Sequence, residues 1–365
     1  MPTADVLIIG GGVIGLTTAY TLARDGARVT LLDRQDFGRE SSWAGAGIIS
    51  PGNPERAATP YDKLRAISSV AYPLLAAELR ERTGIDPGYR CTGGLEFDDP
   101  DGSIDADAWK SEGIAWERLT ADRVPSVEPA AGPDAGPAYY LPGMAQVRNP
   151  RLVRALVASL RTHDVTLGPG CPVYAWETNG TRVDAVVTHA GRQVAGQYVL
   201  CAGAWSDELL RPLGVRANVR PVRGQIALLN TRATAPAKVL IRGKRYIVPR
   251  GDGRVLVGST EEDAGFEKRT TASAIAGLLE FGTRLVPSLA DATIERCWAG
   301  LRPGSPDGRP FIGRVPGFND VWVAAGHFRS GIQLAPGTAR ILAEAIHGRP
   351  TALPLEPFQL DRSKE

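Results

Sequence analysis

Three glycines follow a short apolar run near the start of the chain, at Gly10, Gly12 and Gly15. In a strand–turn–helix unit, the first glycine permits a tight turn, the second lets the backbone approach a pyrophosphate, and the third lets helix and strand pack closely. Asp33 ends the next apolar run, where a carboxylate can accept hydrogen bonds from ribose hydroxyls. These residues predict a dinucleotide site and leave open whether it binds NAD or FAD.

A βαβ unit must position these glycines. Residues 6–9 form a continuous apolar run, which is typical of a buried parallel strand. Residues 13–24 repeat apolar side chains at helical spacing, and Gly26 follows as a candidate helix C-cap. Residues 28–33 then predict the second strand. The turn thereby places the N-terminus of a helix against the phosphates, where its dipole favours negative charge.

A second run of small residues spans Ser41 to Ile49. Small side chains let backbone N–H groups come close to a flat ring or a phosphate. The alternative is a flexible loop without a ligand.

The rest of the chain predicts two further kinds of structure. Residues 215–298 are rich in expected strands and indicate an antiparallel sheet inserted into the nucleotide-binding part. Residues 124–143, rich in Pro, Ala and Gly, predict a surface crossing with no domain of its own. Outside these segments we expect strands at 183–188, 198–201 and 321–325, and helices from Asn149 and over 331–347.

Composition excludes several classes of protein. The chain has 365 residues, of which 43% are hydrophobic and 22% charged, with a net charge of +2, which is ordinary for a globular enzyme of about two domains. Because Lys and Arg are scattered, we expect neither nucleic acid nor an anionic membrane as a partner. The four cysteines form no C-x-x-C pair, so we expect no metal and a reducing, cytoplasmic compartment. We also expect no signal peptide and no membrane span.

The last hundred residues carry more specific patterns. They contain WAGLRPGSPDGRPFIGR at 298–314 and AAGHFRSGIQLAPGTA at 324–339, and RYIVPR and CAGAWSDELLRPLG occur earlier, at 245–250 and 201–214. Together these segments resemble the flavin-dependent amine oxidase family that includes D-amino acid oxidase, sarcosine oxidase and glycine oxidase, and the glycine oxidase branch is the most similar. The resemblance extends from Asp5 to Arg362.

The resemblance implies an α/β fold, with a Rossmann-like FAD-binding domain and an inserted antiparallel-sheet substrate domain. The expected ranges are 1–88, 145–215 and 299–365 for the first, and 89–144 and 216–298 for the second. It also implies that FAD is bound non-covalently, since some relatives tether flavin to a cysteine near 301–312 and this chain has none there. The FAD-binding residues that we expect are Gly10, Gly12, Val13, Ile14, Gly15, Asp33, Arg34, Ser41, Ser42, Ala46, Gly47, Ile48, Val173, Ala202, Gly203, Trp205, Arg302, His327, Phe328, Arg329, Ser330, Gly331 and Ile332.

Three residues are expected at the substrate. A substrate carboxylate calls for a bidentate guanidinium, and Arg302, after an apolar run and before a Pro-Gly turn, matches the family's carboxylate-binding arginine. Tyr246 matches a tyrosine that hydrogen-bonds the same carboxylate, and Arg329 either positions substrate or lies at the surface. We expect His327 to pack beside the flavin and not to act as a general base.

The implied reaction is the oxidative deamination of glycine and other small primary, secondary or D-amino acids. A hydride passes from Cα to the flavin, O₂ reoxidises the flavin to give H₂O₂, and the imine hydrolyses to a 2-oxo acid and ammonia, or feeds thiamine thiazole synthesis. The resemblance further implies a homo-oligomer, with a tetramer as the expected form.

Other functions stay open on the sequence. They are a D-amino acid dehydrogenase, an oxidase of an N-substituted amino acid, a nicotinamide dehydrogenase and a non-catalytic flavin subunit. The preferred amine is open too. Glu261 either faces the pocket beside Lys244, which favours a basic or N-substituted amine, or points to solvent.

Overall fold

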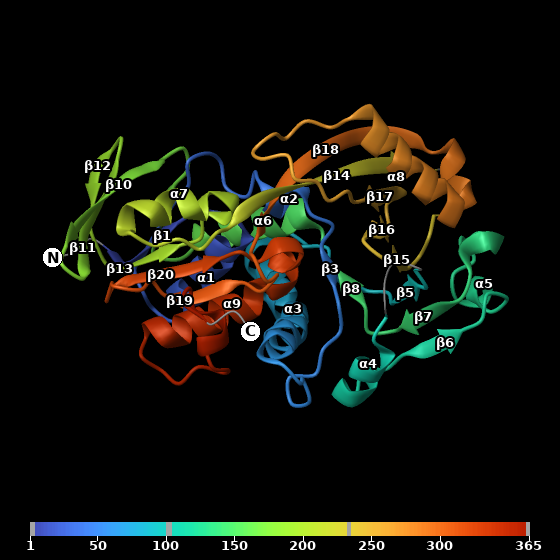
Figure 1. The fold of residues 1–365 in the computed structure, drawn as a ribbon, viewed down its shortest axis with the longest axis horizontal. Coiled ribbons are helices and arrows are strands. Elements are labelled where there is room, and N and C mark those ends of the chain that lie inside the picture. Colours follow the sequence, from blue (N-terminus) through green and yellow to red (C-terminus); the bar gives the residue numbers. More distant parts are fainter. Residues whose placement is uncertain (1–3, 100–103, 232–234, 363–365) are drawn as a thin grey trace.

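The computed structural model describes residues 4–99, 104–231 and 235–362. Within these ranges two large sheets carry most of the strands. Figure 1 shows them in different halves of the molecule, one with α1, α3 and α9 on one side of it and the other lying beneath α8.

The first sheet is the one that the glycine turn requires. Its strands pair in parallel except at one edge, where β19 runs antiparallel to β20. Its central strands are buried apolar runs covered on both faces, as expected for a parallel sheet. The strands are, in spatial order, β19 (Phe311–Arg314), β20 (Val321–Ala325), β13 (Ala195–Leu200), β1 (Ala4–Ile9), β2 (Val29–Leu32) and β9 (Val165–Gly168).

Helices pack on this sheet, and the N-termini of two of them, α1 and α9, lie in the same region. α1 (Val13–Arg24) packs against both α9 (Gly331–Ile346) and α6 (Asn149–Leu160), and α3 (Pro60–Thr83) packs on the same pair. The helices expected at 13–24, from Asn149 and over 331–347 are thus confirmed. None of the helices in the described ranges has the length and apolar character needed to cross a membrane. The remaining α-helices are α2 (Ser41–Ala44), α4 (Ala106–Glu112), α5 (Val124–Val127), α7 (Ser206–Leu210) and α8 (Ala272–Leu285).

The second sheet is mostly antiparallel, as the sequence predicts, with one exception. β5 and β15 pair in parallel, because β5 enters from a distant part of the chain and no hairpin joins it to β15. The strands are, in spatial order, β18 (Thr293–Gly304), β14 (Arg220–Asn230), β17 (Arg254–Gly258), β16 (Arg245–Pro249), β15 (Val239–Arg242), β5 (Gly94–Phe97), β7 (Ala138–Leu141) and β6 (Glu117–Leu119).

Two small three-stranded sheets accompany the two large ones in the described ranges. One contains β10 (Val173–Asn179), β11 (Arg182–Thr188) and β12 (Gly191–Gln193), and the other contains β3 (Ile48–Ile49), β8 (Ala145–Gln146) and β4 (Arg90–Cys91).

The prediction of a surface crossing at 124–143 is wrong. The segment supplies β7 to the interior of the second sheet, and Ala130, Ala131 and Ala135 are buried in the core beneath α8. Gly132 donates its N–H to the carbonyl of Leu285. The alanines and glycines that resemble a loop in composition allow close packing against α8.

The division into two domains stays a prediction. The strands of the first sheet fall within 1–88, 145–215 and 299–365, whereas those of the second fall within 89–144 and 216–298, except that β18 continues across the boundary to Gly304. β18 thereby connects the two sheets, and it carries Arg302 near its end.

Two glycine-to-alanine substitutions test the packing of the turn. A Cβ at Gly15 would overlap the carbonyl oxygen of Gly10, whereas one at Gly277 in α8 would meet nothing within 4 Å. We expect Gly15→Ala to lower the free energy of unfolding by about 2 kcal/mol through overpacking. Gly277→Ala, the control, should raise it by up to about 1 kcal/mol through helix propensity. Urea unfolding measures the free energy of unfolding of both variants. Equal changes in Gly15→Ala and Gly277→Ala would contradict the close packing of Gly15 against Gly10.

Candidate functional site

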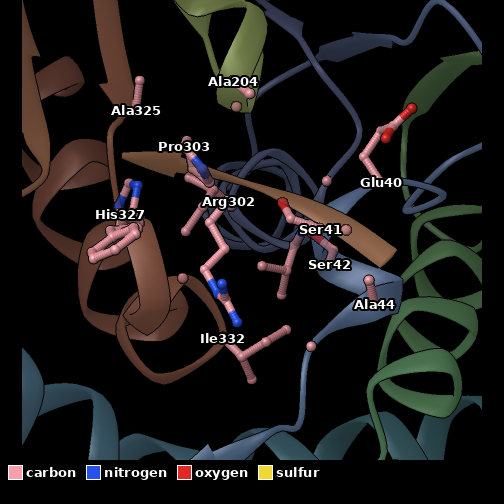
Figure 2. A pocket seen from close by; sticks show the side chains of 18 of the residues that line it. Glu40, Ser41, Ser42, Ala44, Ala204, Arg302, Pro303, Ala325, His327 and Ile332 are labelled. Carbon is pink, nitrogen blue, oxygen red and sulfur yellow. The ribbon is translucent and has the colours of Figure 1, made fainter. Parts of the chain in front are cut away.

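A cavity of about 530 Å³ is lined by residues of both large sheets and by the N-terminal ends of α1 and α9. Figure 2 shows the Arg302 side chain entering its centre, with Ser42 on one side and His327 on the other. The first residues of α1 and α9 thus both border this cavity.

The glycine turn lies at the cavity wall where β1 passes into α1. Gly10 has a φ of 109°, which favours glycine, and any Cβ there would overlap the carbonyl of Cys201. Gly12 caps α1 and lines the cavity. Gly15 lies behind the wall, against the turn, as its predicted packing role requires.

The start of α1 offers unused hydrogen-bond donors. Val13 donates its N–H to Ser42 Oγ at 2.8 Å. In the part of the chain that the structure describes, the N–H groups of Gly12 and Ile14 have no protein acceptor. Free donors at a helix N-terminus beside a glycine without a side chain fit a pyrophosphate. A dinucleotide such as FAD therefore suits this end of the cavity.

Asp33 lies at the carboxyl end of β2 and lines the cavity. Its Oδ2 accepts the N–H of Gly11 at 2.7 Å, and its Oδ1 accepts the N–H of Gln35 at 2.9 Å. Burial raises the pKa of this carboxyl group, and the two N–H donors oppose the shift. Each oxygen keeps a lone pair that a ribose hydroxyl could donate to.

Arg34 is fixed by its neighbours at the same end. Its guanidinium lies 3.6 Å from the centre of the Trp205 ring and pairs with Glu40 at 3.1 Å. Arg34, Glu40 and Trp205 all line the cavity.

The run of small residues from Ser41 is a structured part of the wall. It forms the short helix α2, and Trp298 donates its indole N–H to the carbonyl of Ala44 at 3.0 Å. Gly47 has a φ of 74°, and a Cβ there would overlap Asn149 and Val147. The flexible-loop alternative is thus excluded, and the backbone of this run borders the cavity.

The turn into α9 forms the opposite wall. His327 is buried, and its Nε2 lies 3.1 Å from Thr338 Oγ1. Burial lowers the pKa of His327 to about 3, so the imidazole is neutral near pH 7. Gly331 and Ile332, at the N-terminal end of α9, line the cavity. A helix N-terminus at this place stabilises negative charge that forms in the cavity.

Arg302 is half-buried, and its guanidinium lies inside the cavity. It lies within β18, and the turn expected at Pro303 and Gly304 is wrong because both residues continue the pairing with β14. The guanidinium donates to the carbonyl of Thr260 at 3.0 Å and to Ser259 Oγ at 2.5 Å. Among the described residues no carboxylate forms an ion pair with it.

Electrostatics around Arg302 follow from this burial. Burial lowers the pKa of the guanidinium, and Tyr246 and Glu261 oppose the shift. Tyr246, on β16, lines the same cavity. A half-buried guanidinium bound only to neutral oxygens retains the capacity to bind a carboxylate.

Gly224 makes room for this arrangement. It lies on β14 opposite Gly300 on β18, and a Cβ there would overlap the Arg302 guanidinium. Gly224 and Ser259 were not predicted from the sequence. Gly224 lies within β14, where a glycine often marks a close approach of another group.

Three charged side chains meet at the edge of the cavity. Glu261 lies between Lys244, at 2.8 Å, and Arg329, at 3.3 Å. Burial alone would raise the pKa of Glu261, but Lys244, Arg329 and Arg302 outweigh it, so the pKa is lowered. Lys244 and Arg329 line the cavity, whereas Glu261 faces the two cations. The group carries one net positive charge.

The structure thus brings together all but two of the predicted site residues. The two exceptions are Gly15 and Ser330. Ser330 Oγ accepts the Tyr61 hydroxyl at 2.9 Å behind the cavity wall. The other predicted residues at the wall are Gly10, Gly12, Val13, Ile14, Asp33, Arg34, Ser41, Ser42, Ala46, Gly47, Ile48, Val173, Ala202, Gly203, Trp205, Tyr246, Arg302, His327, Phe328, Arg329, Gly331 and Ile332.

The sequence matches a family model described as FAD dependent oxidoreductase over residues 5–345. It is 42% identical to a glycine oxidase of Pseudomonas aeruginosa over 356 residues, which cover 97% of each chain. It is 37% identical to the bifunctional protein ThiO/ThiG of Synechocystis, where the match covers 94% of this chain and 52% of the longer protein.

The fold agrees with these matches. The crystal structure of glycine oxidase from Geobacillus kaustophilus superposes with a TM-score of 0.93 at 30% identity, covering 99% of both chains. The comparisons thus identify a flavoenzyme, and the cavity with its glycine turn and two helix N-termini is suited to its cofactor. The chain belongs to the family of FAD dependent oxidoreductases that includes the glycine oxidases.

Proposed function

We propose that this enzyme oxidises glycine and other small primary, secondary or D-amino acids, with FAD as cofactor and O₂ as electron acceptor. The observation that carries the proposal is Arg302, a half-buried cation that projects into the FAD cavity without a carboxylate partner among the described residues. The names of the glycine oxidase relatives support the choice of substrate.

The substrate carboxylate supplies the anionic partner that Arg302 lacks among the described residues. In this proposal it forms a bidentate pair with the guanidinium, and Tyr246 donates a hydrogen bond to it from β16. The pair fixes one end of a small molecule, so its Cα is held over the cofactor, and positioning of this kind supplies much of the rate enhancement.

No protein base is required at the substrate amine, which enters in its neutral form. His327 is neutral, buried and within hydrogen-bond distance of Thr338. When bound, FAD would supply the acceptor for the hydride of the substrate Cα and the route by which its two electrons reach O₂ to give H₂O₂. The N-terminus of α9 stabilises the negative charge that the reduced ring acquires.

The imine product would hydrolyse to a 2-oxo acid and ammonia or serve the thiazole branch of thiamine synthesis, a role supported by the similarity to ThiO/ThiG. The four cysteines are unpaired, which supports the predicted cytoplasmic location. The homo-oligomer stays a prediction.

A second candidate is an oxidase of an N-substituted glycine. The observation that favours it is the net positive charge of Lys244, Arg329 and Glu261 at the edge of the cavity. A second carboxylate on the amine nitrogen would find a cation there.

A peroxide-coupled assay tests both candidates and the acceptor. We expect H₂O₂ from glycine, sarcosine and D-alanine without an added acceptor. Turnover of N-carboxymethyl glycine well above that of glycine would favour the second candidate. Dye reduction without peroxide would instead identify a dehydrogenase and contradict the oxidase proposal.

Replacing Arg302 tests the carboxylate anchor. We expect Arg302→Ala to retain FAD and lower kcat/KM for glycine by at least about a hundredfold, the equivalent of roughly 3 kcal/mol. The flavin spectrum checks that the cofactor is still bound. An unchanged kcat/KM would show that the carboxylate binds elsewhere.

Replacing Gly224 tests the space around that anchor. The three atoms nearest to a Cβ at Gly224 belong to the end of the flexible Arg302 side chain, so we expect Gly224→Ala to displace Arg302 while the fold survives. The expected result is a KM for glycine raised about tenfold, the scale of one lost hydrogen bond, and a melting temperature near that of the parent. Gly277→Ala is the control, and an unaltered KM in Gly224→Ala would argue against this geometry.

The neutral state of His327 predicts a pH dependence of stability. Because burial lowers its pKa to about 3 from the ordinary value of 6.5, the unfolded chain binds a proton below about pH 6.5 that the folded protein does not bind. The free energy of unfolding should therefore fall as pH drops from 6.5 toward 3, by up to about 1.4 kcal/mol per unit from this residue. Chemical unfolding of the parent and of His327→Gln at several pH values isolates the contribution. If the free energy of unfolding changed with pH in the same way in both proteins, this role of His327 would be contradicted.

A further inference from the structure

The segment between β17 and α8, residues 259–271, leaves the eight-stranded sheet and reaches the other half of the molecule. In Figure 1 it is the orange loop that extends toward α2 and α7. Of this segment the sequence singled out Glu261, and its first residues, Ser259 and Thr260, accept hydrogen bonds from Arg302.

Both ends of this segment are held firmly by β14. Arg223 and Glu262 exchange backbone hydrogen bonds of 2.9 Å, and the buried Arg223 guanidinium also pairs with the Glu262 carboxylate at 2.5 Å. The fully buried Gln225 accepts the N–H of Thr271 at 2.8 Å. These contacts fix where the middle of the segment must lie.

The middle of the segment contacts two residues of the cavity wall. The Phe266 ring lies 5.3 Å from the Trp205 ring, measured between centres, and Lys268 Nζ lies 2.8 Å from Glu40 Oε2. Trp205 and Glu40 both line the FAD cavity, at the end that contains Arg34 and therefore Asp33.

The charge of Glu40 explains why a cation is needed there. Glu40 places a carboxylate in the wall of a cavity that must accept a pyrophosphate. Burial alone would raise its pKa, but Lys268, Gln35 and Arg34 outweigh burial and lower it, so the group is ionised near pH 7. Its negative charge would repel the cofactor unless neighbouring cations compensate it.

We propose that Lys268 and Phe266 are positioning residues of the FAD site. Lys268 compensates the charge of Glu40 beside the diphosphate and adenosine part of the cofactor, and Phe266 holds the segment in place through Trp205. The inference rests on FAD occupying this cavity with its adenosine end at Asp33, and it does not depend on which amine is oxidised.

The test is the dissociation constant of FAD, measured by titrating deflavinated protein with FAD and following flavin fluorescence. We expect Lys268→Met to raise it about tenfold and Lys268→Arg to leave it near the parent value. Arg269→Met is the matched control, because Arg269 lies on the same segment but pairs with Glu267, away from Glu40. Lys268→Met should also flatten the salt dependence of FAD binding.

A double variant separates compensation of charge from a merely structural role. If Lys268 acts through the charge of Glu40, Glu40→Gln combined with Lys268→Met should restore FAD affinity to within about twofold of the parent. Persistent weakening in the double variant would overturn the charge argument, and an unchanged dissociation constant in Lys268→Met would overturn the proposal.

Phe266→Ala provides an independent variant if Lys268→Met does not fold, and we expect it to weaken FAD binding about threefold. An FAD affinity equal to that of the parent would contradict its role. Failure of the proposed function is distinguishable, since it would appear as absent glycine oxidation in the FAD-saturated parent while the FAD dissociation constants remain measurable.

Discussion

The site depends on a single constraint, the partial burial of the Arg302 guanidinium without a carboxylate partner in the described part of the chain. A buried cation is costly unless hydrogen bonds and an anion compensate it. Ser259 and the carbonyl of Thr260 supply two hydrogen bonds, Gly224 supplies the space, and the anion is left for the substrate to provide. The pairing of β14 with β18 brings these groups together, so the larger sheet is the frame of the substrate anchor.

The cofactor half of the site favours negative charge. Two helix N-termini, those of α1 and α9, lie at one cavity, and each favours negative charge in its vicinity. The first suits a pyrophosphate, and the second suits the charge of a reduced flavin. Glu40 places a negative charge in the wall, and its neighbours Arg34 and Lys268 offset it.

Sequence alone predicted the parts of the fold that are local. The strand, glycine turn and helix ending at Arg24 depend on spacing within one short stretch, and so does α9. Segment 124–143 was misjudged because its alanines become buried only when α8 packs on them. Gly224 and Lys268 were missed for the same reason, since their roles arise from contacts with Arg302 and Glu40, which are distant in the chain.

The central claim, that Arg302 awaits a carboxylate, is tested most directly with acetate, which has the carboxylate of the substrate and no amine. Titration of the FAD-bound enzyme with acetate should perturb the visible flavin spectrum saturably and in competition with glycine. The same titration of Arg302→Ala should give no saturable change. Equal acetate affinity in the two proteins would contradict the assignment of Arg302 as the carboxylate anchor.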